Sequence, residues 1–161
     1  LMQSNVICSD IEMRRRVDRV INIFEVCEVN PFGPDALVAA YNESEEWLDE
    51  LNRYLYDNYL ELKRFFAEYM PKIEVLKLEG TYLVWVDISA LEFTSDELEA
   101  KLRDEGKVYL NSGTMYGRRA GQGYMRINIA CPRSRMIDGL TRMAKVLAPY
   151  MEDDCDLGCP S

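Results

Sequence analysis

The feature that most constrains the fold of this chain is one long amphipathic stretch that ends at a proline. Asn42 or Ser44 can cap a helix here, and Pro71 cannot continue one. Between them, apolar residues recur at the spacing of one helix face; they are Trp47, Leu48, Leu51, Leu55, Tyr59, Leu62, Phe66 and Tyr69. A helix over residues 45–70 has about 26 residues and, at roughly 1.5 Å each, a length of about 39 Å. Because this length exceeds a compact small domain, we expect an interdomain helix whose aromatic side chains pack in a core.

Beyond Pro71 the hydrophobic period changes from that of a helix to that of strands. The predicted strands are residues 73–78, 81–88, 108–111 and 123–130, and the predicted helices are residues 94–106 and 134–148. Thr94 and Glu97 have the spacing of a capping box at the first of these helices. This order predicts an α+β fold, an α/β sandwich in which a small, mostly antiparallel sheet is covered by helices.

The predicted strand at 123–130 carries an arginine, Arg126, among apolar residues. A guanidinium keeps its charge inside a protein, so a buried one needs an anionic partner. Its planar fork fits a carboxylate with two parallel hydrogen bonds. Arg126 is therefore a candidate seat for a substrate carboxylate. The alternative is that it pairs with an internal Asp or Glu, and the chemistry of the residue alone leaves both open.

Several short motifs occur in a defined order around this arginine. They are Trp47-Leu48-Asp49, Tyr54 with Asp57-Asn58, Gly80 to Asp87, Val108 to Gly113, Tyr116-Gly117, a glycine-rich loop to Gly123, and Arg126-x-Asn128-x-Ala130-x-Pro132-Arg133. Together they resemble the C-terminal part of the class I/II aminotransferase family of fold-type I pyridoxal-phosphate (PLP) enzymes. The nearest branch is that of the cystathionine β-lyase-like C–S lyases. The resemblance covers roughly residues 3 to 148.

The resemblance implies a fold and an activity for the complete protein. The fold would be the C-terminal domain of a PLP-dependent transferase-like fold. The activity would be that of a PLP-dependent C–S β-lyase, which cleaves the C–S bond of sulfur amino acids and acts as a homodimer. A PLP-dependent aminotransferase is the alternative within the same family. Outside it, a non-enzymatic dimerisation module or a carboxylate-binding module centred on Arg126 remains open.

The resemblance also assigns substrate-binding roles. Arg126 would bind the α-carboxylate of the amino-acid substrate, and the turn Asn111, Ser112 and Gly113 would lie beside it. Tyr82 would approach the edge of the substrate, although a tyrosine that packs across strands is equally compatible with its position. No residue of this chain is predicted to be catalytic, and its cofactor-binding residues stay unknown.

The cofactor lysine is missing from these motifs. A PLP enzyme holds its cofactor through a lysine as a Schiff base. None of the six lysines lies in the Ser-x-Lys setting of the family; they are Lys63, Lys72, Lys77, Lys101, Lys107 and Lys145. The resemblance places that lysine upstream of Leu1. We therefore expect this chain to be a C-terminal portion of a larger enzyme and to be inactive alone.

This interpretation divides the chain into three parts. Residues 1–43, with a buried strand at 4–8, are predicted to be the remnant of the large cofactor-binding domain. Residues 44–150 would form the linking helix and the small C-terminal domain, and residues 151–161 a flexible acidic tail. Without the large domain, residues 4–41 would expose apolar surface, so the fragment is expected to self-associate.

Composition excludes several other classes of function. The net charge of −9 argues against nucleic acid as a partner, because phosphate binding needs a basic face. No apolar run reaches the roughly 18 residues of a membrane span, and no signal-peptide pattern begins the chain, so a cytoplasmic protein without membrane contact is expected. The chain has no histidine, and no metal site is predicted. Cys155 and Cys159 are expected to stay reduced, and a disulfide between them is the alternative that the sequence leaves open.

Overall fold

The computed structural model describes residues 6–25 and 28–151 of the chain. They divide into two compact units, Leu1–Leu51 and Asn52–Ser161. The predicted acidic tail lies, except for Met151, outside the described residues, as do Cys155 and Cys159.

The first unit consists of helices. They are α1 (Ile11–Ile23), α2 (Gly33–Glu43) and the first residues of α3 (Glu45–Tyr69). The predicted strand at 4–8 is wrong for residues 6–8, which are irregular, while residues 4 and 5 lie outside the described part. The side chain of Asp10 caps α1 by accepting a hydrogen bond from the Met13 N–H at 2.9 Å. No residue of α1 is buried in the described structure, and Val20, Ile23 and Phe24 expose apolar surface. Self-association through this surface stays a prediction.

Helix α3 confirms the long helix expected from the sequence. It has 25 residues, which corresponds to about 38 Å, and it ends just before Pro71. Leu55, Tyr59, Leu62 and Phe66 form its buried stripe. The predicted core position is wrong for Trp47 and Tyr69, which are 64% and 50% exposed. Tyr69 lies outside the buried stripe, which continues through Phe66 to Met70. Among the described residues no helix combines the length and the apolar character that a membrane crossing requires.

The second unit contains an antiparallel sheet of four short strands. They are β1 (Glu74–Val75), β2 (Leu83–Asp87), β3 (Asn111–Ser112) and β4 (Tyr124–Asn128), in the spatial order β1-β2-β4-β3. The strand expected at 108–111 begins only at Asn111. The Val108 N–H instead donates to the Leu102 carbonyl at 3.0 Å, so the end of the preceding helix takes this backbone away from the sheet.

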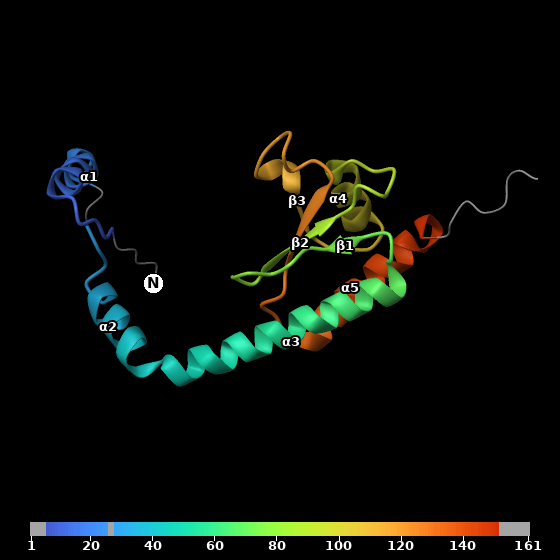
Figure 1. Cartoon of the computed structure of the whole chain (residues 1–161), viewed down its shortest axis with the longest axis horizontal. Coiled ribbons are helices and arrows are strands. Elements are labelled where there is room, and N and C mark those ends of the chain that lie inside the picture. The colour runs from blue at the N-terminus through green and yellow to red at the C-terminus, as the bar shows by residue number, and fades with distance from the viewer. Residues whose placement is uncertain (1–5, 26–27, 152–161) are drawn as a thin grey trace, which may run out of the picture. The chain divides into compact units, whose positions relative to one another are not determined.

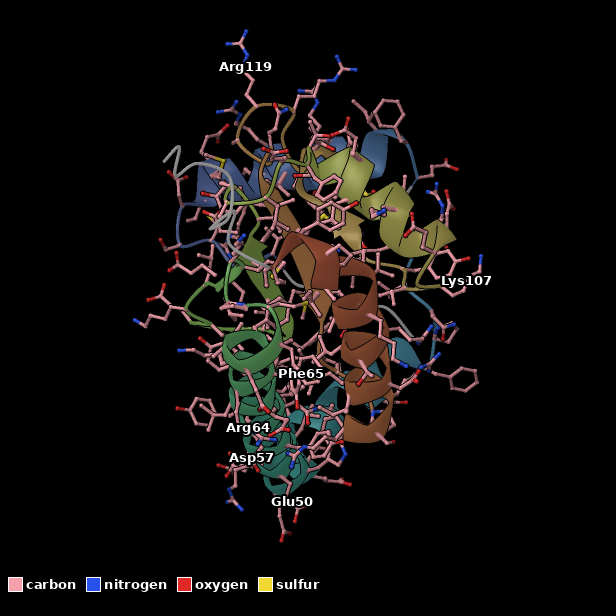
Figure 2. The ribbon with its side chains drawn as sticks, turned by 90° about the vertical axis from the view of Figure 1, so that its right-hand side faces the viewer. Glu50, Asp57, Arg64, Phe65, Lys107 and Arg119 are labelled. Atoms are coloured by element: carbon pink, nitrogen blue, oxygen red, sulfur yellow. The ribbon has the colours of Figure 1, made fainter. Side chains whose placement is uncertain are left out.

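The helices of the second unit pack against one face of this sheet. They are α4 (Ser95–Asp104), α5 (Arg133–Leu147) and the later part of α3, with two short 3₁₀ turns, η1 (Gly113–Met115) and η2 (Ala148–Tyr150). Thr94 and Glu97 form the predicted capping box of α4. Figure 1 shows α3 and α5 side by side below the sheet, and Figure 2 shows the same pair from the side. The α+β sandwich expected from the sequence is therefore present.

Alternation along the two central strands separates a core face from an open face. Val84 and Val86 of β2, and Met125 and Ile127 of β4, are buried against the helices. Side chains of successive strand residues point to opposite faces, so Trp85 and Arg126 lie on the other face. The same two strands thus supply the core and the candidate site.

The glycine-rich loop before β4 closes onto η1 through a backbone contact that needs glycine. A Cβ on Gly121 would lie 1.9 Å from the carbonyl oxygen of Gly113, and a Cβ on Gly113 would lie 2.2 Å from that of Gly121. Neither position can accept a side chain without moving backbone. The contact fixes where the loop returns to the sheet.

Replacing Gly121 tests this packing. Gly121→Ala is expected to lower the midpoint of thermal unfolding, since overpacking of this kind costs about 1–3 kcal/mol. Gly139→Ala is the matched control, because nothing lies within 4 Å of its added Cβ and alanine is the better helix residue in α5. The control is expected to raise the midpoint slightly. Equal midpoints for the two variants would contradict the packing described for Gly121.

Candidate functional site

Arg126 lies at the centre of β4, between its two neighbouring strands. It pairs with Trp85 of β2 on one side and with Asn111 of β3 on the other. The side chain is half-buried on the open face of the sheet, opposite the buried Met125 and Ile127. Its position follows directly from the alternation of the strand, which sends residue 126 away from the core.

An aromatic side chain supports the guanidinium from one side. Arg126 Cζ lies 4.2 Å from the centre of the Tyr116 ring. The Tyr116 ring in turn meets Trp85 edge to face, with the ring centres 5.4 Å apart and an angle of 88°. The Tyr116 hydroxyl accepts a hydrogen bond from Asn111 Nδ2 at 2.9 Å. We name Trp85, Asn111, Tyr116 and Arg126 the Arg126 cluster. Stacking occupies one face of the guanidinium and leaves its N–H edges able to bind an anion.

Arg126 forms no ion pair with any acidic residue in the described part of the chain. The arginine ion pairs that the structure contains involve other residues, among them Arg64 with Glu61 and Arg142 with Asp138. The internal-pair alternative therefore finds no partner within residues 6–25 and 28–151. The binding of a substrate carboxylate by Arg126 stays a prediction, and this geometry is compatible with it.

The other predicted site residues differ in how close the structure brings them to Arg126. Asn111 belongs to the Arg126 cluster and orients Tyr116. Gly113 is buried under the glycine-rich loop. Tyr82 precedes β2, its side chain is 45% exposed, and no hydrogen bond or ring contact joins it to Arg126 in the described structure. Its carbonyl oxygen accepts a hydrogen bond from the Ile129 N–H at 3.0 Å, which ties it to the end of β4.

Ser112 points to the opposite face of the sheet from Arg126. It pairs with Met125 in the register of β3 and β4. Its buried hydroxyl donates to Asp96 Oδ1 at 2.5 Å, and Thr114 Oγ1 donates to the same oxygen at 2.5 Å. These two hydroxyl hydrogen bonds hold the pKa of Asp96 below its usual range. A contact of Ser112 with substrate stays a prediction, and in this structure its hydroxyl is hydrogen-bonded to Asp96 of α4.

Sequence reasoning missed Ser95, which holds the loop before β4. Its hydroxyl donates to the Gly121 carbonyl at 3.2 Å and accepts from the N–H groups of Gly123 and Tyr124 at 2.9 and 3.1 Å. The side chain is fully buried. The capping box explains Thr94 and Glu97 but gives no signal for the serine between them, because its partners come from a distant part of the sequence.

A pocket of about 240 Å³ lies beside the Arg126 cluster and is lined by Leu76, Trp85, Gly113, Tyr116, Ala120, Gly121 and Tyr124. PLP enzymes hold their cofactor through a lysine, and this lining contains none. Lys77 and Lys101 are instead paired with Glu79 and Glu105. No group of three His, Cys, Asp or Glu residues that could bind a metal occurs in the described part.

Comparisons with known proteins agree on one family. The family model "Aminotransferase class I and II" matches residues 6–142. Cystathionine beta-lyase PatB of Bacillus subtilis is 38% identical over 120 residues, which are 74% of this chain and 31% of the relative. The chain thus spans about a third of the length of this curated relative.

Two solved structures support the same placement. Cystalysin of Treponema denticola, which contains a pyridoxal 5′-phosphate cofactor, matches 89% of this chain and 36% of its own with a TM-score of 0.83 and 28% identity. A PLP-bound C–S lyase of Staphylococcus hominis matches 83% of this chain and 36% of its own with a TM-score of 0.71 and 28% identity.

The lowered pKa of Asp96 predicts a pH dependence of stability. Because the pKa is lower in the folded chain, the hydrogen bonds to Asp96 stabilise it fully above the usual value of 3.8, and this stabilisation is lost as the pH falls below that value. The midpoint temperature of thermal unfolding should therefore fall more steeply from pH 5 to pH 2.5 for the wild type than for Asp96→Asn. Thr114→Val, which removes one of the two hydroxyl donors, should give an intermediate slope. Parallel curves for all three proteins would contradict the role assigned to Asp96.

Proposed function

Since the chain belongs to the class I and II aminotransferase family, we propose that the complete protein is a PLP-dependent C–S β-lyase acting on sulfur amino acids of the cystathionine type. The likeness to cystathionine beta-lyase PatB, at 38% identity, favours this activity within the family. The observation that carries the proposal is Arg126, which is stacked on Tyr116 and has no acidic partner in the described residues. An amino-acid substrate brings the carboxylate that such a group binds.

Arg126 would bind the α-carboxylate of the substrate through its fork of N–H donors. Two parallel hydrogen bonds fix the orientation of the carboxylate, and with it the direction of the bonds at Cα. Tyr116 and Asn111 would restrict the guanidinium to one arrangement before substrate arrives. Such orientation lowers the barrier because the reacting groups need not be ordered during the reaction.

The cofactor and its lysine would be supplied by a part of the enzyme outside this sequence. The pocket beside the Arg126 cluster has no lysine in its lining, which supports this proposal. PLP, when bound, supplies an electron sink for the carbanion at Cα. We also propose that the complete enzyme is a cytoplasmic homodimer. The unpaired thiols of Cys8 and Cys131 fit a reducing compartment. The homodimer is what the resemblance to the family implies.

A PLP-dependent aminotransferase is the second candidate, because the matching family model includes these enzymes. Both activities would use Arg126 in the same way. The products separate them: with water as the only co-reactant, a β-lyase releases a thiol, a keto acid and ammonia from cystathionine. An aminotransferase forms a new amino acid only when a keto-acid acceptor is added.

Arg126→Lys in the complete enzyme is expected to raise KM for the amino acid about tenfold and to lower kcat. A lysine keeps the charge but replaces a two-point fork with a point charge. Arg119→Lys is the matched control, because Figure 2 shows this arginine projecting from the loop before β4, away from the sheet. It should leave both constants unchanged. If Arg126→Lys behaves like the control, Arg126 does not bind the substrate.

The 161-residue chain alone is expected to be inactive. Supplied with PLP and cystathionine, it should release thiol no faster than PLP does in solution, because its candidate site lacks the lysine. The assay compares the chain with the complete enzyme at equal molar concentration. Saturable thiol release by the chain would contradict the proposed division between its residues and the rest of the enzyme.

A further inference from the structure

One buried polar side chain of α3 has no role in the site described above. Asn58 is 0% exposed, and its neighbours on the same helix face, Leu55 and Leu62, are apolar core residues. Its Nδ2 group donates to the carbonyl oxygens of Ile129 and Cys131 at 3.0 and 3.2 Å. Its Oδ1 accepts a hydrogen bond from Arg133 Nε at 3.2 Å. Both amide N–H groups and the amide oxygen are therefore satisfied by one short segment.

A second residue one helical turn earlier binds the same segment. The Tyr54 hydroxyl donates to the Cys131 carbonyl at 3.4 Å and accepts from the backbone N–H of Arg133 at 2.9 Å. The Arg133 guanidinium also lies 5.9 Å from the centre of the Tyr54 ring. We name residues 129–133 the post-strand turn. Tyr54 and Asn58 lie four apart, so α3 presents both on one face to this turn.

The post-strand turn begins where β4 ends, three residues after Arg126. Ile129 is the point where three elements meet. Its carbonyl oxygen accepts from Asn58 of α3, and its N–H donates to the carbonyl of Tyr82. Hydrogen bonds therefore lead from α3 to the end of β4 and on to Tyr82. A displacement of this turn relative to α3 would move the strand that carries Arg126.

The chemistry of Asn58 argues against a role in packing alone. A leucine of similar volume at this position would extend the apolar stripe of Leu55 and Leu62. It would, however, leave the carbonyls of Ile129 and Cys131 without the donor that Asn58 provides. A buried polar group that loses its hydrogen-bond partner lowers the free energy of unfolding by about 1–3 kcal/mol. The amide thus fixes the position of a backbone segment that an apolar side chain would only cover. Such control matters most near a binding group whose position relative to its ligand must be correct to within about 1 Å.

We propose that Asn58, supported by Tyr54, is a positioning residue for the substrate site, because it sets the position of the β4 end and hence of Arg126 and Tyr82 relative to α3. This inference rests on the proposed role of Arg126 in binding the substrate carboxylate. Asn58 itself touches no substrate in this scheme and acts only through the post-strand turn.

The test uses the complete enzyme and two pairs of variants. Tyr54→Phe removes only the hydroxyl, and Tyr56→Phe is its control, since Tyr56 lies on the same helix with no hydrogen bond to the turn in the described structure. Asn58→Leu removes the amide at nearly constant volume, and Leu62→Ala is its control for lost stability without a lost hydrogen bond. Tyr54→Phe keeps the experiment decisive if Asn58→Leu does not fold.

A positioning role predicts a change in KM that loss of stability does not produce. Asn58→Leu should raise KM for the amino acid about tenfold, and Tyr54→Phe by a smaller factor. Tyr56→Phe should leave KM unchanged, as should Leu62→Ala even where it lowers the unfolding midpoint. In an Arg126→Lys background, Asn58→Leu should add little, because the two residues act on the same interaction.

A readout independent of activity is the indole N–H resonance of Trp85, observed by NMR of the 161-residue chain with Trp47 replaced by Phe. Trp85 meets Tyr116, which supports Arg126, so a shifted β4 should move this resonance in Tyr54→Phe but not in Tyr56→Phe. An unmoved resonance, or additive effects of Asn58→Leu and Arg126→Lys on KM, would overturn the positioning role alone. An Arg126→Lys enzyme with unchanged KM would instead overturn the proposed function.

Discussion

The arrangement of the second unit depends on one strand, β4, whose backbone is held at both ends by buried polar side chains. At its start, the hydroxyl of Ser95 binds the N–H groups of Gly123 and Tyr124. Beyond its end, the amide of Asn58 binds the carbonyls of Ile129 and Cys131. Burying such groups costs free energy unless their hydrogen bonds are satisfied. Each side chain therefore requires the distant segment to stay within hydrogen-bond distance. Arg126 lies between these two links, and its position follows from both.

The two faces of β4 have different environments, because its side chains alternate between the core and the open face of the sheet. Met125 and Ile127 face the helices and are buried, whereas Arg126 faces the open side. A cation can be kept at this place because Tyr116 covers one face of the guanidinium without neutralising it. An acidic neighbour would have stabilised the charge but would also have occupied its N–H donors. Aromatic support is therefore compatible with the anion binding proposed for Arg126.

The glycine-rich loop completes this arrangement by bringing η1 and β4 together. The close contact of Gly113 with Gly121 brings two backbones nearer than any side chain would allow. Ser95 holds the same loop through the Gly121 carbonyl. These contacts give the loop a defined position beside Tyr116, although it is rich in glycine.

Features that depend on neighbouring residues along the chain could be predicted from local patterns. Pro71 ended α3 because a proline cannot continue a helix, Thr94 and Glu97 capped α4, and the alternation of β4 placed Arg126 opposite the core. The order of motifs also identified the family. Local patterns were insufficient at residues 6–8 and 108–110, where strands were expected and none formed.

Contacts between side chains that are distant in the sequence could not be predicted in this way. Asn58 and its partners are 71 and 73 residues apart, and nothing in the periodicity of α3 distinguishes a buried amide from a solvated one. The support of Arg126 by Tyr116 likewise depends on how the loop folds back. Hydrogen bonds and ring contacts of this kind form only after distant segments have packed, so no local pattern in the sequence can carry them.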